Sequence, residues 1–289
     1  MARRLLRFSL VGIILVLMLA VYVPVQQRLL RHRAERLLSS IRTLELRKSN
    51  WEDAQRLIHH WGSWGDDKGR CTSGGCLYTI ELTDRLLNTA RSHPKLFKLW
   101  SWLYRPYSFL GGRPTRVIAS FTVKDGIIWR KSYELIVTVP PEKGPDAPFG
   151  GYGYDLIGRA RTVSNFYPRQ TPQVLLHPEY QVWSPGGCKI CKAVVAEYTP
   201  YAAHSDIQRL MNFNLSCITS REPCREKNEI LPAAWAHLES EAESIDKAWH
   251  RVLACDYPLQ VRGRDSRHAV VAEIVSNRRE QSGRRAYQR

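Results

Sequence analysis

The residues of this sequence best suited to chemistry are its seven cysteines. Six of them form three closely spaced pairs: Cys71 and Cys76, Cys188 and Cys191, and Cys217 and Cys224. Close cysteine pairs serve as thiol–disulfide exchange centres, as zinc ligands or as structural disulfides. The seventh, Cys255, is the odd thiol and is expected to be half-buried at the end of a helix. The use of each pair depends on the elements that carry it.

The pair Cys188-Lys-Ile-Cys191 has the C-x-x-C spacing of thiol–disulfide oxidoreductases. In those enzymes a helix N-terminus lowers the pKa of the first thiol. Here residues 192–198 alternate in polarity, which predicts a strand over 188–198. Residues three apart in a strand lie about 10 Å apart on opposite faces, whereas a disulfide needs Cα atoms within about 7 Å. A membrane-tethered oxidoreductase using Cys188 and Cys191 is therefore an alternative function only.

A zinc site would use Cys188, Cys191, Cys217 and Cys224. The first two have the spacing of a common zinc half-site, but the six residues between Cys217 and Cys224 exceed the usual two to four. Zinc also requires reduced thiols, so this second alternative is a zinc-binding module that faces the cytoplasm.

Structural disulfides are the main prediction for these six cysteines, because closely spaced, even sets are typical of domains outside the cytoplasm. We expect one bridge between Cys71 and Cys76. The other four cysteines form either two bridges between strand 188–198 and loop 217–224, or one such bridge plus a local Cys217–Cys224 bridge. The sequence has no G-x-S-x-G, P-loop or H-E-x-x-H motif, so no catalytic, cofactor-binding or metal residue is predicted.

An apolar segment, Phe8–Val25, precedes all of these residues and contains no charge. Eighteen helical residues extend about 27 Å, close to the roughly 30 Å of a bilayer core. The segment is longer than the apolar region of most cleaved signal peptides. An uncleaved signal anchor is therefore predicted, with the N-terminus in the cytoplasm. The predicted organisation lists residues 1–7 as cytoplasmic, 8–25 as the transmembrane helix, 26–48 as a juxtamembrane stalk, 49–258 as an extracytoplasmic domain that divides near 140–153, and 259–289 as a basic, partly mobile segment.

The net charge of +16 is concentrated at the two ends of the chain. Residues 1–48 contribute +8 and residues 259–289 contribute +5, which leaves only +3 for the body. A basic segment beside a membrane helix is expected to meet anionic headgroups. The predicted partner is therefore the lipid bilayer, and nucleic acid is not a predicted partner.

An apolar a/d pattern covers residues 30–44 directly after the anchor. It consists of Leu30, Ala34, Leu37, Ile41 and Leu44. Two heptads suit either a stalk that forms a homodimer or a helix that packs on its own domain or lies on the bilayer. Both alternatives stay open, as does a separate protein partner.

The remaining pattern predicts an α+β domain of mainly antiparallel strands with flanking helices. A capping box at residues 49–52 starts a helix that ends near Gly62. Two β-rich segments, 116–123 and 127–139, are joined by Asp125-Gly126, which is a strong hairpin signal. Further strands are expected over 154–168, 177–183 and 188–198, and helices over 204–215 and from Pro232 onward. Loop 140–153 and the aromatic segment 100–110 are the candidate contact surfaces.

Four short stretches carry a resemblance to a known group of proteins. They are Lys48-Ser-Asn-Trp-Glu-Asp-Ala-Gln55, Trp61-Gly62, Cys71 and Cys76-Leu-Tyr78. Their order resembles an uncharacterised group of acidobacterial single-pass membrane proteins over roughly residues 40 to 80. The resemblance implies a bacterial envelope location and no known activity. The function predicted is that of a membrane-anchored, non-catalytic envelope protein with a disulfide-braced binding or assembly domain.

Overall fold

The computed structural model describes residues 2–67, 71–84, 107–139, 154–163, 179–185, 191–220, 222, 224–240 and 243. The chain divides into one unit of residues Met1–Ala242 and a second of Glu243–Arg289. The predictions for loop 140–153, Cys188, Cys255 and the basic segment 259–289 fall outside the described residues.

A seven-stranded sheet with the order β1-β2-β3-β4-β5-β7-β6 forms the centre of the first unit. Its strands are β1 (Gly65–Asp67), β2 (Gly75–Thr83), β3 (Thr115–Lys124), β4 (Ile127–Val139), β5 (Tyr154–Thr162), β6 (Tyr180–Trp183) and β7 (Cys191–Tyr198). All neighbouring strands are antiparallel except β5 and β7, which are parallel. The predicted α+β class with mainly antiparallel strands is confirmed.

The hairpin β3–β4 forms where the sequence predicts it. Asp125 and Gly126 have φ values of 52° and 75°, which is the left-handed conformation that a two-residue type I′ turn requires at both positions. Both residue types tolerate this conformation, so Asp-Gly fixes the position of the turn.

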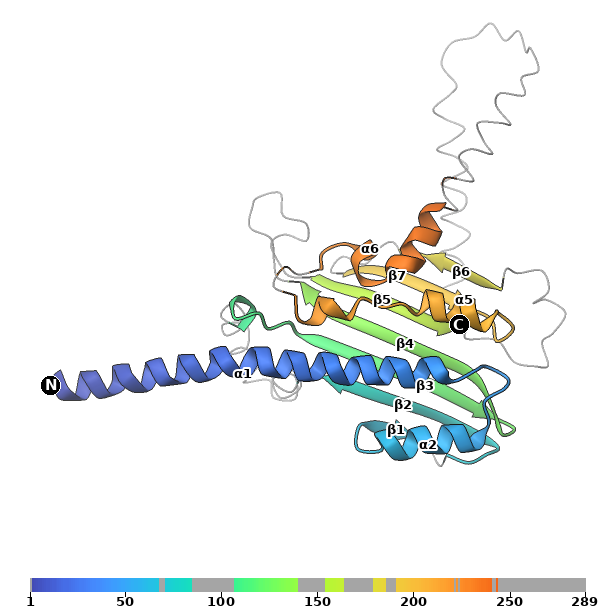
Figure 1. Cartoon of the computed structure of the whole chain (residues 1–289), viewed down its shortest axis with the longest axis horizontal. Helices are drawn as coiled ribbons and strands as arrows, with labels where there is room; N and C mark the ends of the chain where they lie inside the picture. Colours follow the sequence, from blue (N-terminus) through green and yellow to red (C-terminus); the bar gives the residue numbers. More distant parts are fainter. Residues whose placement is uncertain are drawn as a thin grey trace, which may run out of the picture. The chain divides into compact units, whose positions relative to one another are not determined.

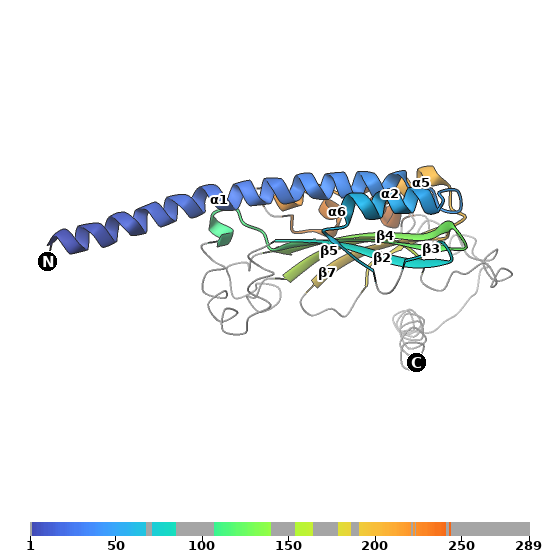
Figure 2. The same ribbon diagram turned by 90° about the horizontal axis from the view of Figure 1, so that it is seen from below.

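Helices cover one face of the sheet, as Figures 1 and 2 show. They are α1 (Ala2–Thr43), α2 (Trp51–Trp61), α5 (His204–Leu210), the 3-10 helix η3 (Leu215–Ile218) and α6 (Lys227–Ile230), and residues 232–240 are also helical. The helix predicted over 204–215 is therefore shorter, because α5 ends at Leu210 and a separate 3-10 turn follows.

The start of α2 differs from the prediction by one residue. Asn50, not Ser49, is the N-cap: its side chain accepts from the Asp53 backbone N–H, and the Asp53 carboxylate accepts from the Asn50 N–H. The capping-box pattern is therefore present, but with Asn and Asp in place of the expected Ser and Glu.

The long helix α1 supplies much of the core. The a/d residues of segment 30–44 lie in the same buried cluster as the sheet, with exposed fractions between 0% and 8%. Of the two alternatives for this segment, the structure therefore has the helix that packs on its own domain. A homodimer through residues 30–44 would have to displace that packing. Among the described residues, no helix meets the combined length and hydropathy criteria for a membrane span.

Candidate functional site

The junction between α1 and the sheet gathers the most unusual polar side chains of the described structure. At its centre lies Lys131 of β4, which is only 1% exposed. Its Nζ donates to the backbone carbonyls of Ile41 at 3.3 Å, Arg42 at 3.4 Å and Leu44 at 2.5 Å. The last carbonyls of a helix lack N–H donors within the helix and carry the negative end of its dipole. Lys131 therefore anchors the C-terminal end of α1 to the sheet.

Burial lowers the pKa of Lys131 from its ordinary value to about 8, because removal from water disfavours the ammonium. The nearby Glu45 carboxylate raises this pKa and Arg42 lowers it, both by less than burial does. At neutral pH the amine is still mainly protonated, so it can donate to all three carbonyls. A lysine with such a pKa can act as a base in enzymes, but here its donors are occupied by the main chain.

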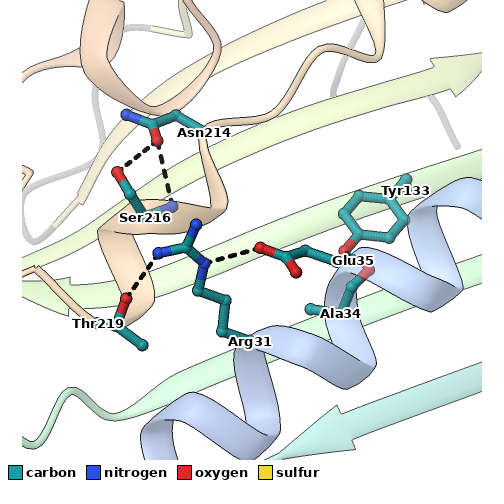
Figure 3. A network of polar contacts seen from close by, with 7 residues as sticks. All are labelled: Arg31, Ala34, Glu35, Tyr133, Asn214, Ser216 and Thr219. Atoms are coloured by element: carbon teal, nitrogen blue, oxygen red, sulfur yellow. Dashed lines mark hydrogen bonds and ion pairs between the residues drawn. The ribbon is translucent and has the colours of Figure 1, made fainter.

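Two buried tyrosines extend this junction. The Tyr133 hydroxyl donates to the carbonyl of Ala34 in the middle of α1 at 3.1 Å, as Figure 3 shows from close by. The Tyr198 hydroxyl donates to the carbonyl of Lys131 at 2.9 Å. Burial raises the pKa of both hydroxyls, so both stay protonated donors. They connect α1, β4 and β7 into one hydrogen-bonded layer.

Arg31 connects α1 to the 3-10 helix η3 (Figure 3). Its Nε lies 2.7 Å from Glu35 Oε1 and its Nη1 donates to Thr219 Oγ1 at 3.0 Å. Across from it, Asn214 caps η3 by accepting from the Ser216 N–H at 3.1 Å. These groups are partly exposed, so the contribution to stability is small. They place η3, and with it Cys217, beside α1.

A second polar cluster lies near the other end of the part of α1 that is buried. Gln27 Nε2 donates to Asp84 Oδ2 at 2.8 Å and to the Tyr107 hydroxyl at 2.7 Å, and this hydroxyl donates to Asp84. The three residues are 2%, 6% and 6% exposed. Burial and the charge of Asp84 raise the pKa of Tyr107, so it remains a donor. Sequence reasoning missed this cluster, because its members are 57 and 80 positions apart from Gln27.

The described cysteines are used in disulfides. Cys71 bonds Cys76 across a Cα–Cα distance of 4.4 Å, as predicted, and Cys217 bonds Cys224 across 5.3 Å. Cys191 is also in a disulfide, whose partner lies outside the described residues. Because Cys217 and Cys224 bond each other, the prediction of a bridge between strand 188–198 and this loop is wrong; only the local bridge forms.

The disulfides also bear on the two chemical alternatives. Three members of the predicted zinc set, Cys191, Cys217 and Cys224, are oxidised in this structure and offer no thiolate. The described residues contain no group of three or more His, Cys, Asp or Glu that could hold a metal. Strand β7 is described from Cys191 onward and Cys188 lies outside the described residues, so the predicted strand geometry of the 188–191 pair stays a prediction. It remains that a strand, not a helix N-terminus, follows the motif.

The opposite face of the sheet has a different chemistry. Its arginines lie next to glutamates on neighbouring strands: Arg116 with Glu81, Arg159 with Glu134, and Arg161 with Glu197, at 2.5–2.8 Å. The first two pairs are partly exposed, whereas in the third Glu197 is buried and Arg161 is partly exposed. Each glutamate neutralises its arginine, so these three pairs add no net charge to this face of the sheet.

A hollow of about 640 Å³ lies between α1 and α2. Its lining combines the apolar side chains of Leu44 and Leu57 with polar side chains, which are those of Ser39, Ser40, Thr43, Ser49, Asp53, Arg56 and His60. Asp53 accepts from the Asn50 N–H and is also paired with Arg56, and both contacts lower its pKa. The Asp53 carboxylate is therefore already paired with groups of α2 and its N-cap.

Comparisons with family models, with curated proteins and with solved structures find no match to this chain.

Proposed function

We propose that this chain is a membrane-anchored, non-catalytic protein of a bacterial envelope, whose disulfide-braced domain binds or assembles with a partner outside the cytoplasm. The observation that carries the proposal is the contrast along α1. One helix runs from residue 2 to residue 43; the described side chains of residues 13–19 are apolar and exposed, and those of the 30–44 apolar seam are buried against the sheet.

The first part of α1 is apolar on all sides. Val16, Leu17, Met18 and Leu19 are consecutive and are 47–67% exposed. Successive helical residues point about 100° apart, so four in a row face every direction. A helix that is apolar all round requires apolar surroundings on every side, which a bilayer supplies. Large exposed apolar surfaces of this kind mark membrane or protein contacts.

The second part of α1 makes the anchor a rigid mount. Leu37 and Ile41 are fully buried. From the sheet, the side chains of Lys131 and Tyr133 donate hydrogen bonds to backbone carbonyls in α1 and just after its end. The domain would therefore be held at a fixed distance and angle to the membrane, since no linker separates anchor and core. This suits a protein that presents a binding surface at a set height.

A non-catalytic role is supported by how the reactive groups are used. The described cysteines are in disulfides, the low-pKa lysine caps a helix, and the sheet-face arginines are paired with glutamates. Disulfides of this kind are typical of an oxidising compartment.

Membrane extraction and a topology reporter test the anchor. The full chain in membranes should resist extraction with alkaline carbonate, and a reporter fused to its C-terminus should be active outside the cytoplasm. The double variant Ile14→Lys and Leu17→Lys should pass to the soluble fraction, because two charges in the bilayer core oppose insertion. Leu77→Lys, at a 43% exposed position of β2, is the matched control and should stay with the membrane.

Thiol counting tests the structural role of the cysteines. Five described cysteines are disulfide-bonded, one of them Cys191, and a partner for Cys191 within the chain would leave one of the seven cysteines free. Alkylation before reduction should modify one thiol, and after reduction in denaturant seven. A wild-type chain that carbonate extracts, or a reporter active only in the cytosol, would overturn the proposal.

A further inference from the structure

We propose that the turn formed by residues 107–112 is a second membrane contact, in which Phe109 inserts into the lipid surface beside α1. The inference rests on the proposed membrane anchor, since it takes its orientation from α1. It adds a site that holds the domain against the bilayer at a point far from the anchor in the sequence.

The position of the turn follows from the Gln27 cluster. Gln27 lies two residues after Val25, the last residue of the predicted anchor, which is about 3 Å along the helix axis. The Tyr107 hydroxyl lies 2.7 Å from Gln27 Nε2, and both side chains are buried. The turn that begins at Tyr107 is therefore fixed at the level where α1 would leave the hydrocarbon core.

The turn itself is a closed structure that displays one side chain. Its backbone is held by hydrogen bonds from the Gly111 N–H to the Ser108 carbonyl at 3.1 Å and from the Gly112 N–H to the Tyr107 carbonyl at 3.0 Å. Gly111 has a φ of 85°, which favours glycine. A Cβ on Gly112 would come within 2.4 Å of the Tyr107 ring, so the chain passes tightly over that ring.

Phe109 lies at the tip of this turn with 90% of its surface exposed, more than any other large apolar side chain in the part of the chain that the structure describes. The neighbouring Tyr107 is buried, so the exposure is specific to Phe109 and not a property of the whole segment. A fixed, exposed aromatic ring is costly in water and is favoured where headgroups meet acyl chains.

The charge next to this level fits a lipid surface as the occupant. Arg28 is exposed and follows Gln27 directly on α1. Arginines at this depth attract anionic headgroups. The exposed Phe109 ring and the exposed Arg28 therefore suit the two parts of a membrane surface, the acyl chains and the anionic headgroups.

Site-specific photocrosslinking in membranes tests this contact. The photoreactive amino acid p-benzoylphenylalanine would replace Phe109, Leu17 or Tyr201 in the full chain, reconstituted in vesicles of phosphatidylethanolamine and phosphatidylglycerol. Tyr201 is the matched control: it is 37% exposed and stacks under Arg47, beyond the far end of α1. Thr43, the last residue of α1, is 18 residues from Val25, about 27 Å along the helix. After irradiation, intact mass would report phospholipid adducts.

We expect lipid adducts at Leu17 and Phe109, and at least tenfold fewer at Tyr201. Adducts at Leu17 but none at Phe109 would overturn the second contact and leave the anchor standing. An absence of adducts at Leu17 would overturn the proposed function itself. Equal labelling at Phe109 and Tyr201 would also overturn the inference, because the domain would then touch lipid without a defined site. Protein adducts at Phe109 in place of lipid adducts would assign the turn to a protein partner and overturn it as well.

Discussion

The two faces of the central sheet stabilise positive charge in opposite ways. Toward the helices, Lys131 is buried and donates to the neutral carbonyls at the end of α1. Away from the helices, Arg116 lies at the surface and pairs with the Glu81 carboxylate on the next strand. Alternate residues of strands produce both arrangements, since neighbouring side chains point to opposite faces. The comparison indicates that the covered face determines how α1 is held, while on the other face Arg116 and Glu81 form a partly exposed ion pair.

The largest expected effect is on the covered face, from Leu37→Ala. Leu37 is fully buried between α1 and the sheet, so the loss of its side chain leaves a cavity in the core. The free energy of unfolding should fall by about 2–5 kcal/mol. Leu77→Ala on β2, where the side chain is 43% exposed, should change it by under about 1 kcal/mol. Urea unfolding of the full chain in detergent measures both. A small effect for Leu37 would show that α1 does not share the core.

The next effect is a dependence on pH from Lys131. Its folded pKa of about 8 lies below its ordinary value of 10.5, so the unfolded chain binds more protons between these pH values. The contribution of this residue to stability is therefore constant below pH 8 and rises as pH increases above it. Relative to Lys131→Met, the wild type should gain about 2 kcal/mol between pH 7 and pH 9.5.

Taking the difference between wild type and Lys131→Met also cancels most of the pH dependence that other titratable groups contribute to the free energy of unfolding. Unfolding curves at several pH values give the difference. If it stays constant from pH 7 to pH 9.5, Lys131 has an ordinary pKa and the buried junction is more hydrated than the structure indicates.

A smaller effect is expected from Tyr133→Phe, which removes only the hydroxyl that donates to the Ala34 carbonyl. The loss should be about 0.5–1.5 kcal/mol, because the Ala34 carbonyl lies within the helix and is not left without a donor. Denaturant midpoints measure it. An increase in stability would mean that the hydroxyl costs more in burial than its hydrogen bond returns.

The smallest effect belongs to the open face. A double-mutant cycle of Arg116→Gln and Glu81→Gln should give a coupling of about 0.2–1 kcal/mol, because the two side chains are 37% and 41% exposed. The coupling should fall in 1 M salt, which screens exposed charges. A coupling above about 2 kcal/mol would erase the distinction between the two faces.

Local sequence signals predicted the elements whose geometry depends on neighbouring residues. Asp125-Gly126 located the hairpin, and the spacing of Cys71 and Cys76 located a bridge. The start of α2 was found to within one residue, because Asn50 and Ser49 are both good caps.

Contacts between distant residues could not be predicted in the same way. Nothing near Lys131 in the sequence indicates that the end of α1 will lie above it, and a lone lysine in a strand is usually exposed. The parallel pairing of β5 with β7 likewise depends on a long connection between them. The disulfide partner of Cys217 was left open because its spacing to Cys224 allowed both alternatives.

The burial of α1 determines where the chain can be shortened. A fragment starting at residue 49, the predicted domain boundary, would lose the helix that covers Leu135, Tyr133 and Lys131. Apolar side chains of the sheet and the Lys131 ammonium would then be exposed to water. A fragment starting at residue 26 keeps Gln27 and the whole apolar seam, and omits the exposed apolar turns. The proposed membrane segment and the folding unit therefore meet within one turn of helix, and a fragment without the proposed anchor should begin there.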